Sequence, residues 1–193
     1  MPSKKPSGQL ALPARERIMR TAHELFYRGG IRATGIDRII AESSVTKVTF
    51  YRHFPSKNDL IKAYLEYRHE LWIGWFVDAL NRHRTRRHPL DALMPVLKEW
   101  FQSNDYRGCA FINTVVEIDG ALPEVSEISR RHKQEMMEVI ASLLPISKHR
   151  VRDAQAISMA IDGAIVRAQM DESPIAALKI LDTLLHSFRL STN

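Results

Sequence analysis

The chain has 193 residues, of which 45% are hydrophobic and 26% charged, with 28 Lys and Arg against 22 Asp and Glu. This composition excludes a disordered, collagenous or fibrous chain, and one cysteine excludes an internal disulfide and gives no sign of a zinc cluster. Residues 1–13 lack the apolar run of a secretory signal, and no stretch approaches the ~18 consecutive apolar residues of a membrane span. We therefore expect a cytoplasmic protein with no membrane partner.

The net charge of +6 is concentrated at one end of the chain. Residues 1–56 hold ten Lys and Arg and four acidic residues, whereas residues 57–193 hold 18 of each kind. A polyanionic partner is therefore expected to meet the first 56 residues. The alternative is a basic face that only contacts solvent.

A first helix is predicted after a basic tail, residues 1–13, that we expect to be flexible. One face of this helix carries apolar residues at i, i+4, i+7 and i+8: Ile18, Ala22, Leu25 and Phe26. Gly29 is placed to end it in a left-handed conformation. A short second helix follows, with Thr34 as its predicted cap, and a third runs from about Thr46 to His53.

A long fourth helix begins at Ser56, which forms a capping signature with Asp59 three residues later. Its apolar run continues to Leu80, and further helices are separated by residues that form turns: Pro89, Asn104 to Gly108, Gly120 to Pro123, Pro145, and Ser173-Pro174. Strand signals are weak throughout. The pattern predicts an all-α fold of about nine helices.

Residues 34–54 have the layout of a DNA-binding helix-turn-helix, in which the second helix of the motif lies in the major groove. The outer side of that helix carries hydrogen-bond donors and cations: Thr46, Lys47, Thr49, Tyr51, Arg52 and His53. Its inner side is apolar and is expected to pack on the first two helices: Val45, Phe50 and Phe54. Lys47 suits guanine acceptors, Thr49 can bond to a base or offer its methyl, and Val48 suits a thymine methyl.

Other residues around this helix are suited to phosphate oxygens. Tyr51 and His53 each carry a single donor, and Lys57 lies in the first turn of the fourth helix, where free N–H groups also favour a phosphate. Thr34 is placed to contact a phosphate from the other side. The alternative is a packed three-helix domain without a role on DNA.

The run from Gly30 to Leu60 also carries a family pattern: a T-x-x-x-I-A segment, a short turn, a recognition helix like T-x-Y-x-H-F, and a following K-x-x-L. The matching residues are Thr34, Ile39, Ile40, Ala41, Val45, Phe50, Tyr51, His53, Phe54, Lys57 and Leu60. With these residues the run resembles the N-terminal DNA-binding domain of the tetracycline-repressor (TetR) family. Ser44 departs from the usual Gly of the turn, and Val48 stands where Gly or another small residue is common.

The resemblance implies the organisation and activity of the whole chain. Residues 14–60 would be the DNA-binding domain and residues 61–193 an effector-binding and dimerisation domain. The protein would be a homodimeric regulator, a repressor that binds a palindromic double-stranded DNA operator and is released by a small apolar or amphipathic effector. It would need no cofactor or metal and would not be an enzyme. The alternatives are a helical binding protein without DNA function and an enzyme that uses Glu117 with a neighbouring His.

An effector pocket is expected among the middle helices, where aromatic, Met and two polar residues gather: Trp72, Trp75, Phe76, Met94, Trp100, Phe101, Phe111, Asn113, Glu117, Met136 and Met137. Aromatic and Met side chains suit adaptable apolar pockets. The alternative for each apolar residue is plain core, and for the polar pair a solvated helix face. Cys109 has apolar neighbours, so we expect a buried structural thiol rather than a redox sensor. An exposed basic loop is predicted at the far end of the long helix, with a contact to an anionic effector as the alternative; its residues are Arg82, His83, Arg84, Arg86, Arg87 and His88.

The last two helices carry stripes that suit a dimer interface. The candidates are Ile157, Ala160, Ile161, Ala164, Ile165, Ala168, Leu181, Leu184, Leu185 and Phe188. Small residues at helical spacing let a second helix approach closely, and two helices from each subunit can form a four-helix interface about a two-fold axis. The alternative is that both stripes belong to the core of a single chain.

Overall fold

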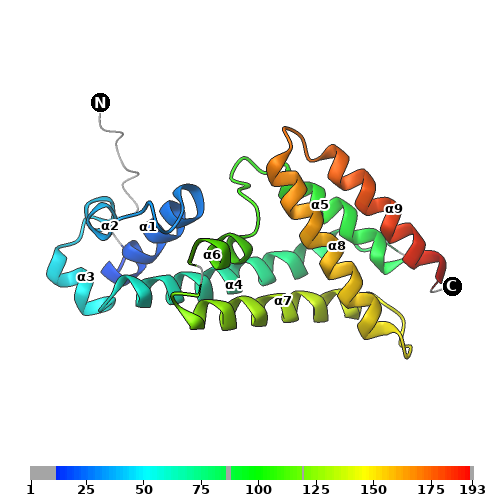
Figure 1. Cartoon of the computed structure of the whole chain (residues 1–193), viewed down its shortest axis with the longest axis horizontal. Helices are drawn as coiled ribbons and strands as arrows, with labels where there is room; N and C mark the ends of the chain where they lie inside the picture. The colour runs from blue at the N-terminus through cyan, green and yellow to red at the C-terminus, as the bar shows by residue number, and fades with distance from the viewer. Residues whose placement is uncertain (1–11, 86–87, 119, 192–193) are drawn as a thin grey trace. The chain divides into compact units, whose positions relative to one another are not determined.

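A computed structural model describes residues 12–85, 88–118 and 120–191, and within these ranges the regular structure is helical throughout (Figure 1). The helices are α1 (Ala14–Gly29), α2 (Ile36–Ser43), α3 (Lys47–His53), α4 (Lys57–Arg82), the short 3₁₀ helix η1 (Pro89–Ala92), α5 (Leu93–Phe101), α6 (Ala110–Ile118), α7 (Pro123–Ser142), α8 (Arg150–Met170) and α9 (Ile175–Ser191). The predicted all-α fold is confirmed. Of the predicted flexible tail, residues 1–11 lie outside the described part of the chain. No helix among the described residues is long and apolar enough to cross a membrane.

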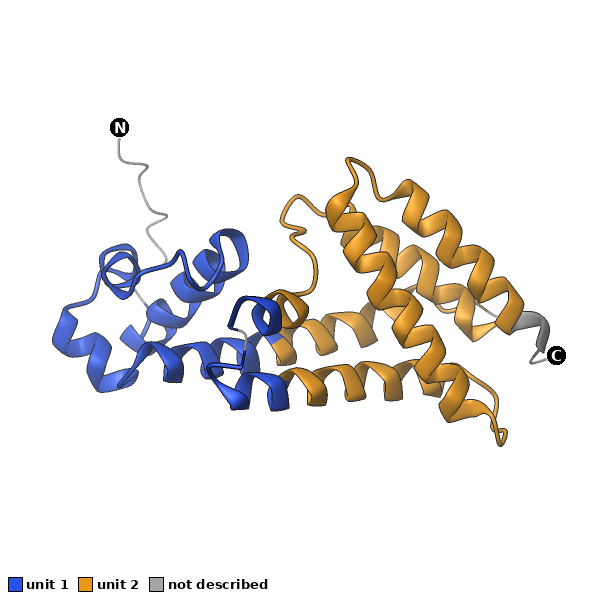
Figure 2. Ribbon diagram, viewed as in Figure 1, with its two compact units in different colours: residues 1–68, 114–128 blue, residues 69–113, 129–193 orange. Residues whose placement is uncertain are grey.

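The chain forms two compact units (Figure 2). Unit 1 comprises residues 1–68 and 114–128, and unit 2 comprises residues 69–113 and 129–193. Helices α4, α6 and α7 each contribute residues to both units. Unit 1 therefore contains, besides the predicted DNA-binding region, two segments that the family resemblance assigns to the effector domain, residues 61–68 and 114–128.

The core of unit 1 is formed by the inner faces of its first helices. Ile18 and Phe26 of α1, Ile39 of α2 and Phe50 of α3 are buried, and α1 packs against both α2 and α3. Each such side chain contributes about 1.5–3 kcal/mol when it leaves water. Phe54, at the end of α3, is also buried, so the predicted inner face of this helix is confirmed for both phenylalanines.

The ends of the short helices are held by local hydrogen bonds. The Thr49 N–H donates to Thr46 Oγ1 (3.1 Å) at the start of α3. Ser56 forms the predicted capping pair, since its Oγ accepts from the Asp59 N–H (3.1 Å) and donates to Asp59 Oδ2 (2.7 Å). The hydrogen bonds from Ser56 and then from Lys62 lower the pKa of the Asp59 carboxyl.

Two predictions about helix ends are wrong. Thr34 does not cap α2, whose N-cap is Gly35 without a side-chain bond. The Thr34 side chain is buried, and its hydroxyl donates instead to the Gly30 carbonyl oxygen (2.7 Å) in the turn after α1. Gly30, rather than Gly29, takes the positive φ of 84° after α1.

The core of unit 2 includes the pairing of α8 with α9. Ile157, Ile161 and Ile165 of α8 and Leu181 and Leu185 of α9 are buried within the single chain. Cys109 is buried as well, as predicted. The apolar stripes of these helices are therefore used inside the subunit.

The imidazole of His23 is a site of pH-dependent stability in unit 1. It lies against Tyr27, Tyr64 and Tyr67, and its Nε2 is 3.2 Å from Nη1 of Arg68. A guanidinium only donates, so this ring nitrogen accepts and the imidazole is neutral. Burial, followed by the charge of Arg68, lowers the pKa of His23 from 6.5 to about 4.

We predict that acid destabilises the fold through His23. The unfolded chain binds a proton at this group with a pKa of 6.5 and the folded chain only at about 4. Above pH 6.5 neither state is protonated at this ring and the free energy of unfolding is unaffected by it. As the pH falls from 6.5 to about 4, the unfolded chain takes up the proton first, and the free energy of unfolding falls by up to about 2 kcal/mol for this partly exposed ring. Urea denaturation at pH 7.5 and 4.5 should show a smaller acid loss for His23→Gln than for the wild type. The exposed His186→Gln should behave as wild type, and parallel curves for all three proteins would contradict the prediction.

Candidate functional site

The outer face of α3 presents most of the predicted DNA-contacting side chains to solvent. Lys47, Tyr51 and Arg52 are exposed, Thr49 and His53 are half-buried, and Val48 is 79% exposed. A single exposed aliphatic side chain is common on protein surfaces, so Val48 is informative only through its place among the donors and cations of this face. The arrangement brings donors, cations and the aliphatic side chain of Val48 together on one helix, and the major groove is wide enough to admit a helix.

The turn between α2 and α3 is built on a strained residue. Ser44 adopts the left-handed conformation (φ 54°, ψ 47°), and its N–H contacts the carbonyl oxygens of Ile40 and Ala41. This conformation costs a non-glycine residue about 1–2 kcal/mol. Ser44 therefore accepts the tight turn that glycine usually occupies, instead of shifting it.

Arg17 holds this turn from α1. Its Nε donates to the Ser43 carbonyl, one Nη to the Ser44 carbonyl and the other Nη to the Leu12 carbonyl, each at 3.1 Å. Hydrogen bonds from a charged donor are stronger than neutral ones, so this set can offset the strain at Ser44. Sequence reasoning missed Arg17, since its two carbonyl partners in the turn lie 26 and 27 residues along the chain.

The turn after α1 is held by two opposite charges. The Glu117 carboxylate, at the end of α6, accepts from the N–H groups of Ile31 (2.9 Å) and Arg32 (2.6 Å). The Lys57 ammonium donates to the Ile31 carbonyl (2.7 Å). Burial lowers the pKa of Lys57, and the Glu117 carboxylate partly opposes the shift. Glycine suits position 30, because its φ of 84° is rarely adopted by other residues and a Cβ there would lie 2.9 Å from Glu117 Oε1.

These contacts count against three predicted roles. Glu117 binds the backbone of unit 1, so its carboxylate is engaged away from the predicted effector residues of unit 2. The Lys57 ammonium is directed to the Ile31 carbonyl, which argues against its predicted phosphate contact. The buried hydroxyl of Thr34 is likewise committed to Gly30. Glu117 was misassigned because its partners lie 85 and 86 residues earlier, beyond any local pattern.

The predicted effector residues of unit 2 form a connected aromatic cluster. The Trp72 ring stacks on Phe76 (centroids 4.7 Å apart) and meets Trp100 edge-on (5.2 Å). Phe111 stacks on His132 at 3.7 Å, and His132 was not among the predicted residues. The remaining apolar candidates are buried or half-buried in unit 2: Trp75, Met94, Phe101, Met136 and Met137. Asn113 is engaged inside the unit, donating to the Arg107 carbonyl (2.8 Å) and accepting from Gln169 (3.4 Å).

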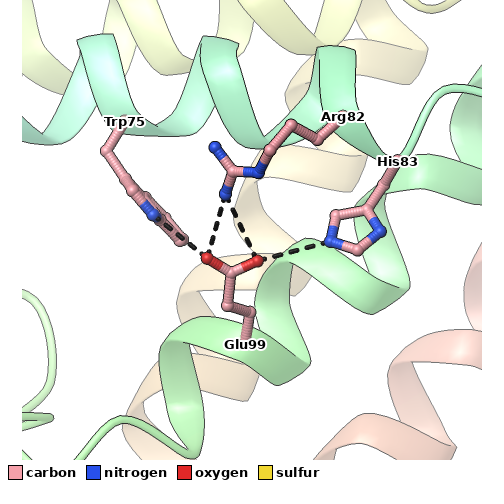
Figure 3. Close-up of polar contacts among 4 residues, drawn as sticks. All are labelled: Trp75, Arg82, His83 and Glu99. Atoms are coloured by element: carbon pink, nitrogen blue, oxygen red, sulfur yellow. Dashed lines mark hydrogen bonds and ion pairs between the residues drawn. The ribbon is translucent and has the colours of Figure 1, made fainter.

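Glu99 of α5 accepts hydrogen bonds from two residues of α4 and from the residue that follows this helix (Figure 3). Its carboxylate accepts from Arg82 (3.0 Å), from His83 (3.3 Å) and from the indole N–H of Trp75 (3.4 Å). Partial burial raises the pKa of Glu99, but the bond from His83 and the charge of Arg82 outweigh it and leave the pKa below its usual value. The first two residues of the predicted basic loop are therefore paired with an acid, which does not favour the anionic-effector alternative.

The predicted dimer residues separate into two groups. Seven are buried in the single chain, which favours the alternative that they belong to its core: Ile157, Ile161, Ala164, Ile165, Ala168, Leu181 and Leu185. Ala160 and Phe188 are half-buried, and Leu184 is exposed. The buried group packs inward because α8 and α9 use these faces against their own subunit.

The architecture defines a class: a three-helix arrangement that presents the second helix of a helix-turn-helix, joined to a larger helical unit, is a DNA-binding regulator. Residues 18–64 match the sequence profile described as bacterial regulatory proteins of the tetR family. The solved structure of a TetR-family transcriptional regulator from Streptomyces coelicolor is 31% identical, with 87% of this chain and 89% of that chain covered and a TM-score of 0.74. The chain therefore belongs to the TetR family of transcriptional regulators and is a DNA-binding protein rather than an enzyme.

Further relatives agree with this assignment. The solved structure of a TetR transcriptional regulator from Chloroflexus aurantiacus is 26% identical, covers 95% of this chain and 96% of that chain, and has a TM-score of 0.76. An uncharacterized HTH-type transcriptional regulator from Bacillus subtilis is 30% identical over 128 residues, which are 64% of this chain. The match spans 42% of the length of that relative.

We predict that Arg17 stabilises the turn through its bonding geometry rather than its charge. Arg17→Lys keeps the charge but cannot reach three carbonyls at once, so the free energy of unfolding should fall by about 1–2 kcal/mol in urea denaturation. The matched control is Arg20→Lys on the same helix, where the guanidinium pairs with Glu16 one turn earlier and is exposed. That change should stay within about 0.5 kcal/mol. Equal losses for the two variants would remove the special role of Arg17.

Proposed function

We propose that the protein is a homodimeric repressor that binds a palindromic operator and is released by a small apolar or amphipathic effector. The observation that carries this proposal is the exposed outer face of α3. The turn before this helix is stabilised by the hydrogen bonds from Arg17 to the Ser43 and Ser44 carbonyls. The charge excess of residues 1–56 supports it further, since cations near this face attract the phosphates of a duplex before any base is read.

The contacts proposed for α3 follow from exposure and bonding state. Lys47 is exposed and can donate to the O6 and N7 acceptors of guanine. Val48 can pack on a thymine methyl, whereas the Thr46 and Thr49 hydroxyls share a hydrogen bond (2.9 Å) and would approach the bases as a pair. The phosphate contacts are assigned to three residues further along the helix: Tyr51, Arg52 and His53. Lys57 and Thr34 are left out of this set.

Selection of random duplexes by the purified protein tests the DNA-reading proposal. The wild type should enrich a palindrome whose half-sites are centred about one helical turn apart. Lys47→Ala should lose discrimination by about 1–3 kcal/mol at one base position of each half-site. The matched control Lys98→Ala, on an exposed position of α5, should enrich the same sequence as the wild type. The absence of an enriched sequence, or an identical one for Lys47→Ala, would contradict the proposed reading.

The proposed dimer uses exposed faces of α8 and α9. On α8, Met159, Val166 and Met170 follow at spacings of seven and four residues, and Met159 is 77% exposed. Gly163 lies on the same stripe with open space around its Cα, which allows close approach of a second helix. On α9, Ile180 and Leu184 are exposed one turn apart. Apolar stripes on two packed helices are the surface that a two-fold four-helix interface requires.

Replacing Val166 with Glu should convert the dimer to a monomer, because the substitution buries an unpaired charge at the proposed interface. Sedimentation equilibrium measures the molecular mass, and the operator affinity should fall by at least about tenfold since each monomer holds a single half-site. The matched control Val116→Glu adds the same charge at an exposed valine of unit 1 and should leave the mass unchanged. A monomeric wild type, or a dimeric Val166→Glu, would refute the assigned interface.

The effector site is proposed for unit 2, around the aromatic cluster of Trp72, Trp100 and Phe111. Ring faces and methionine side chains adapt to flat apolar ligands, and the cluster includes the imidazole of His132 as a polar member. A ligand that binds one conformation of the dimer better than another would shift the DNA-competent population.

A further inference from the structure

The basic side chains of unit 1 differ in whether the protein itself engages them. Three arginines each pair with a glutamate one turn away on the same helix: Arg20, Arg28 and Arg38. The guanidinium of Arg17 and the ammonium of Lys57 bind backbone carbonyl oxygens. Arg15, in the first turn of α1, is exposed, and its side chain forms no ion pair or hydrogen bond with any other described residue. Its donors are therefore available to a partner outside the chain.

One contact orients the Arg15 side chain. The guanidinium carbon lies 5.4 Å from the centroid of the Phe54 ring, within the range of a cation–π contact. Phe54 directly follows α3 and is 3% exposed. Its ring lies 6.2 Å from that of Phe50, which meets the Tyr51 ring edge-on at 5.3 Å. Arg15 is thus connected through two buried rings to a residue on the outer face of α3.

The first turn of α1 reaches both ends of α3. Arg17 in this turn binds the Ser43 and Ser44 carbonyls before α3 begins, and Arg15 covers the ring that follows its last residue. A helix in the major groove has a sugar-phosphate backbone on each side, since the groove is only about 12 Å wide. With α3 in the groove, a cation beside the end of this helix is therefore expected near one of the two backbones.

We propose that Arg15 is a phosphate-contacting residue of the DNA interface and that Phe54 positions it. The inference rests on the proposed role of α3 as the reading helix and adds a contact from outside the helix-turn-helix. A guanidinium that stacks through its face keeps the N–H groups of its edge for other partners. Those groups match two oxygens of one phosphate in a bidentate arrangement.

This contact is expected to add affinity without sequence preference. Arg15 extends from α1 and not from the helix proposed to enter the groove, so its guanidinium is expected at the rim, where phosphates and not base edges lie. The contact with Phe54 restrains the side chain beforehand, which lowers the conformational entropy lost on binding. The competing role is structural, because the Arg15 side chain also shields the Phe54 ring from water. That role alone predicts a loss of stability with no change in the salt dependence of DNA binding.

Fluorescence anisotropy of labelled duplexes with the full-length protein tests the phosphate contact. The probes are the duplex found most often after selection by the wild type and a scrambled duplex of the same length, each titrated between about 50 and 200 mM KCl. Arg15→Ala should weaken binding to both duplexes by about three- to tenfold, because a charge-assisted contact is lost. The slope of log affinity against log salt should become shallower by about one unit per bound protomer.

The matched control is Arg20→Ala on the same helix, where the exposed guanidinium already pairs with Glu16 (2.6 Å). This variant should keep the wild-type slope. Arg15→Lys keeps the charge and should also keep the slope, but should lose about threefold in affinity because an ammonium lacks the planar face and the fork. An unchanged slope in Arg15→Ala, an equal decrease in Arg20→Ala, or a loss confined to the selected duplex would overturn the phosphate contact.

A double-mutant cycle tests the positioning by Phe54. Phe54→Leu keeps an apolar side chain in the core but removes the ring on which the guanidinium stacks. It should weaken DNA binding by about threefold in the wild type and by a smaller factor in Arg15→Ala, where the guanidinium is absent. Additive losses would overturn the role of Phe54. Thermal unfolding of each variant shows whether the fold persists at the temperature of the binding measurement.

The two duplexes also separate this inference from the proposed function. Equal affinity for both, with a slope that depends on Arg15, would support the phosphate contact and count against operator reading by α3. Preference for the selected duplex, with a slope that Arg15→Ala leaves unchanged, would support the reading and overturn the phosphate contact. Absence of binding to either duplex would contradict both.

Discussion

The guanidinium of Arg17 is the contact on which the DNA-facing surface depends. It donates to the carbonyl oxygens of Ser43 and Ser44. These bonds fix the turn between α2 and α3 to the first turn of α1. A left-handed serine is costly, and a turn that relaxed would tilt α3 by changing the direction in which it leaves the turn. The exposed side chains of α3 owe their common orientation to a residue that does not itself lie on that helix.

A second electrostatic contact extends this support to the turn after α1. Glu117 binds its N–H groups and Lys57 binds its carbonyl, so one peptide segment is held by an anion and a cation at once. Each charge offsets part of the free-energy cost of removing the other from water, whereas a single charge at this turn would be left uncompensated.

The parts that were predictable from sequence are those with local causes. Helix periodicity, the Ser56 and Asp59 cap, and the polar outer face of α3 depend on residues within a few positions of one another. The stripe of Ile157 and Ile161 was recognised as apolar, but periodicity does not say whether such a face meets its own chain or another one. The roles of Arg17 and Glu117 required distant backbone atoms, and no pattern in one sequence encodes those.

The same limit explains the two indoles of α4. Trp72 and Trp75 are neighbours on one helix and are identical in chemistry, yet Trp75 donates to Glu99 whereas Trp72 is buried against rings that offer it no acceptor among the described residues. Which of them is satisfied depends on where α5 places one carboxylate. A buried donor without a partner has lost its hydrogen bonds to water and gains none in return. Differences of this kind between two similar side chains can make an apolar interior selective for molecules that carry an acceptor.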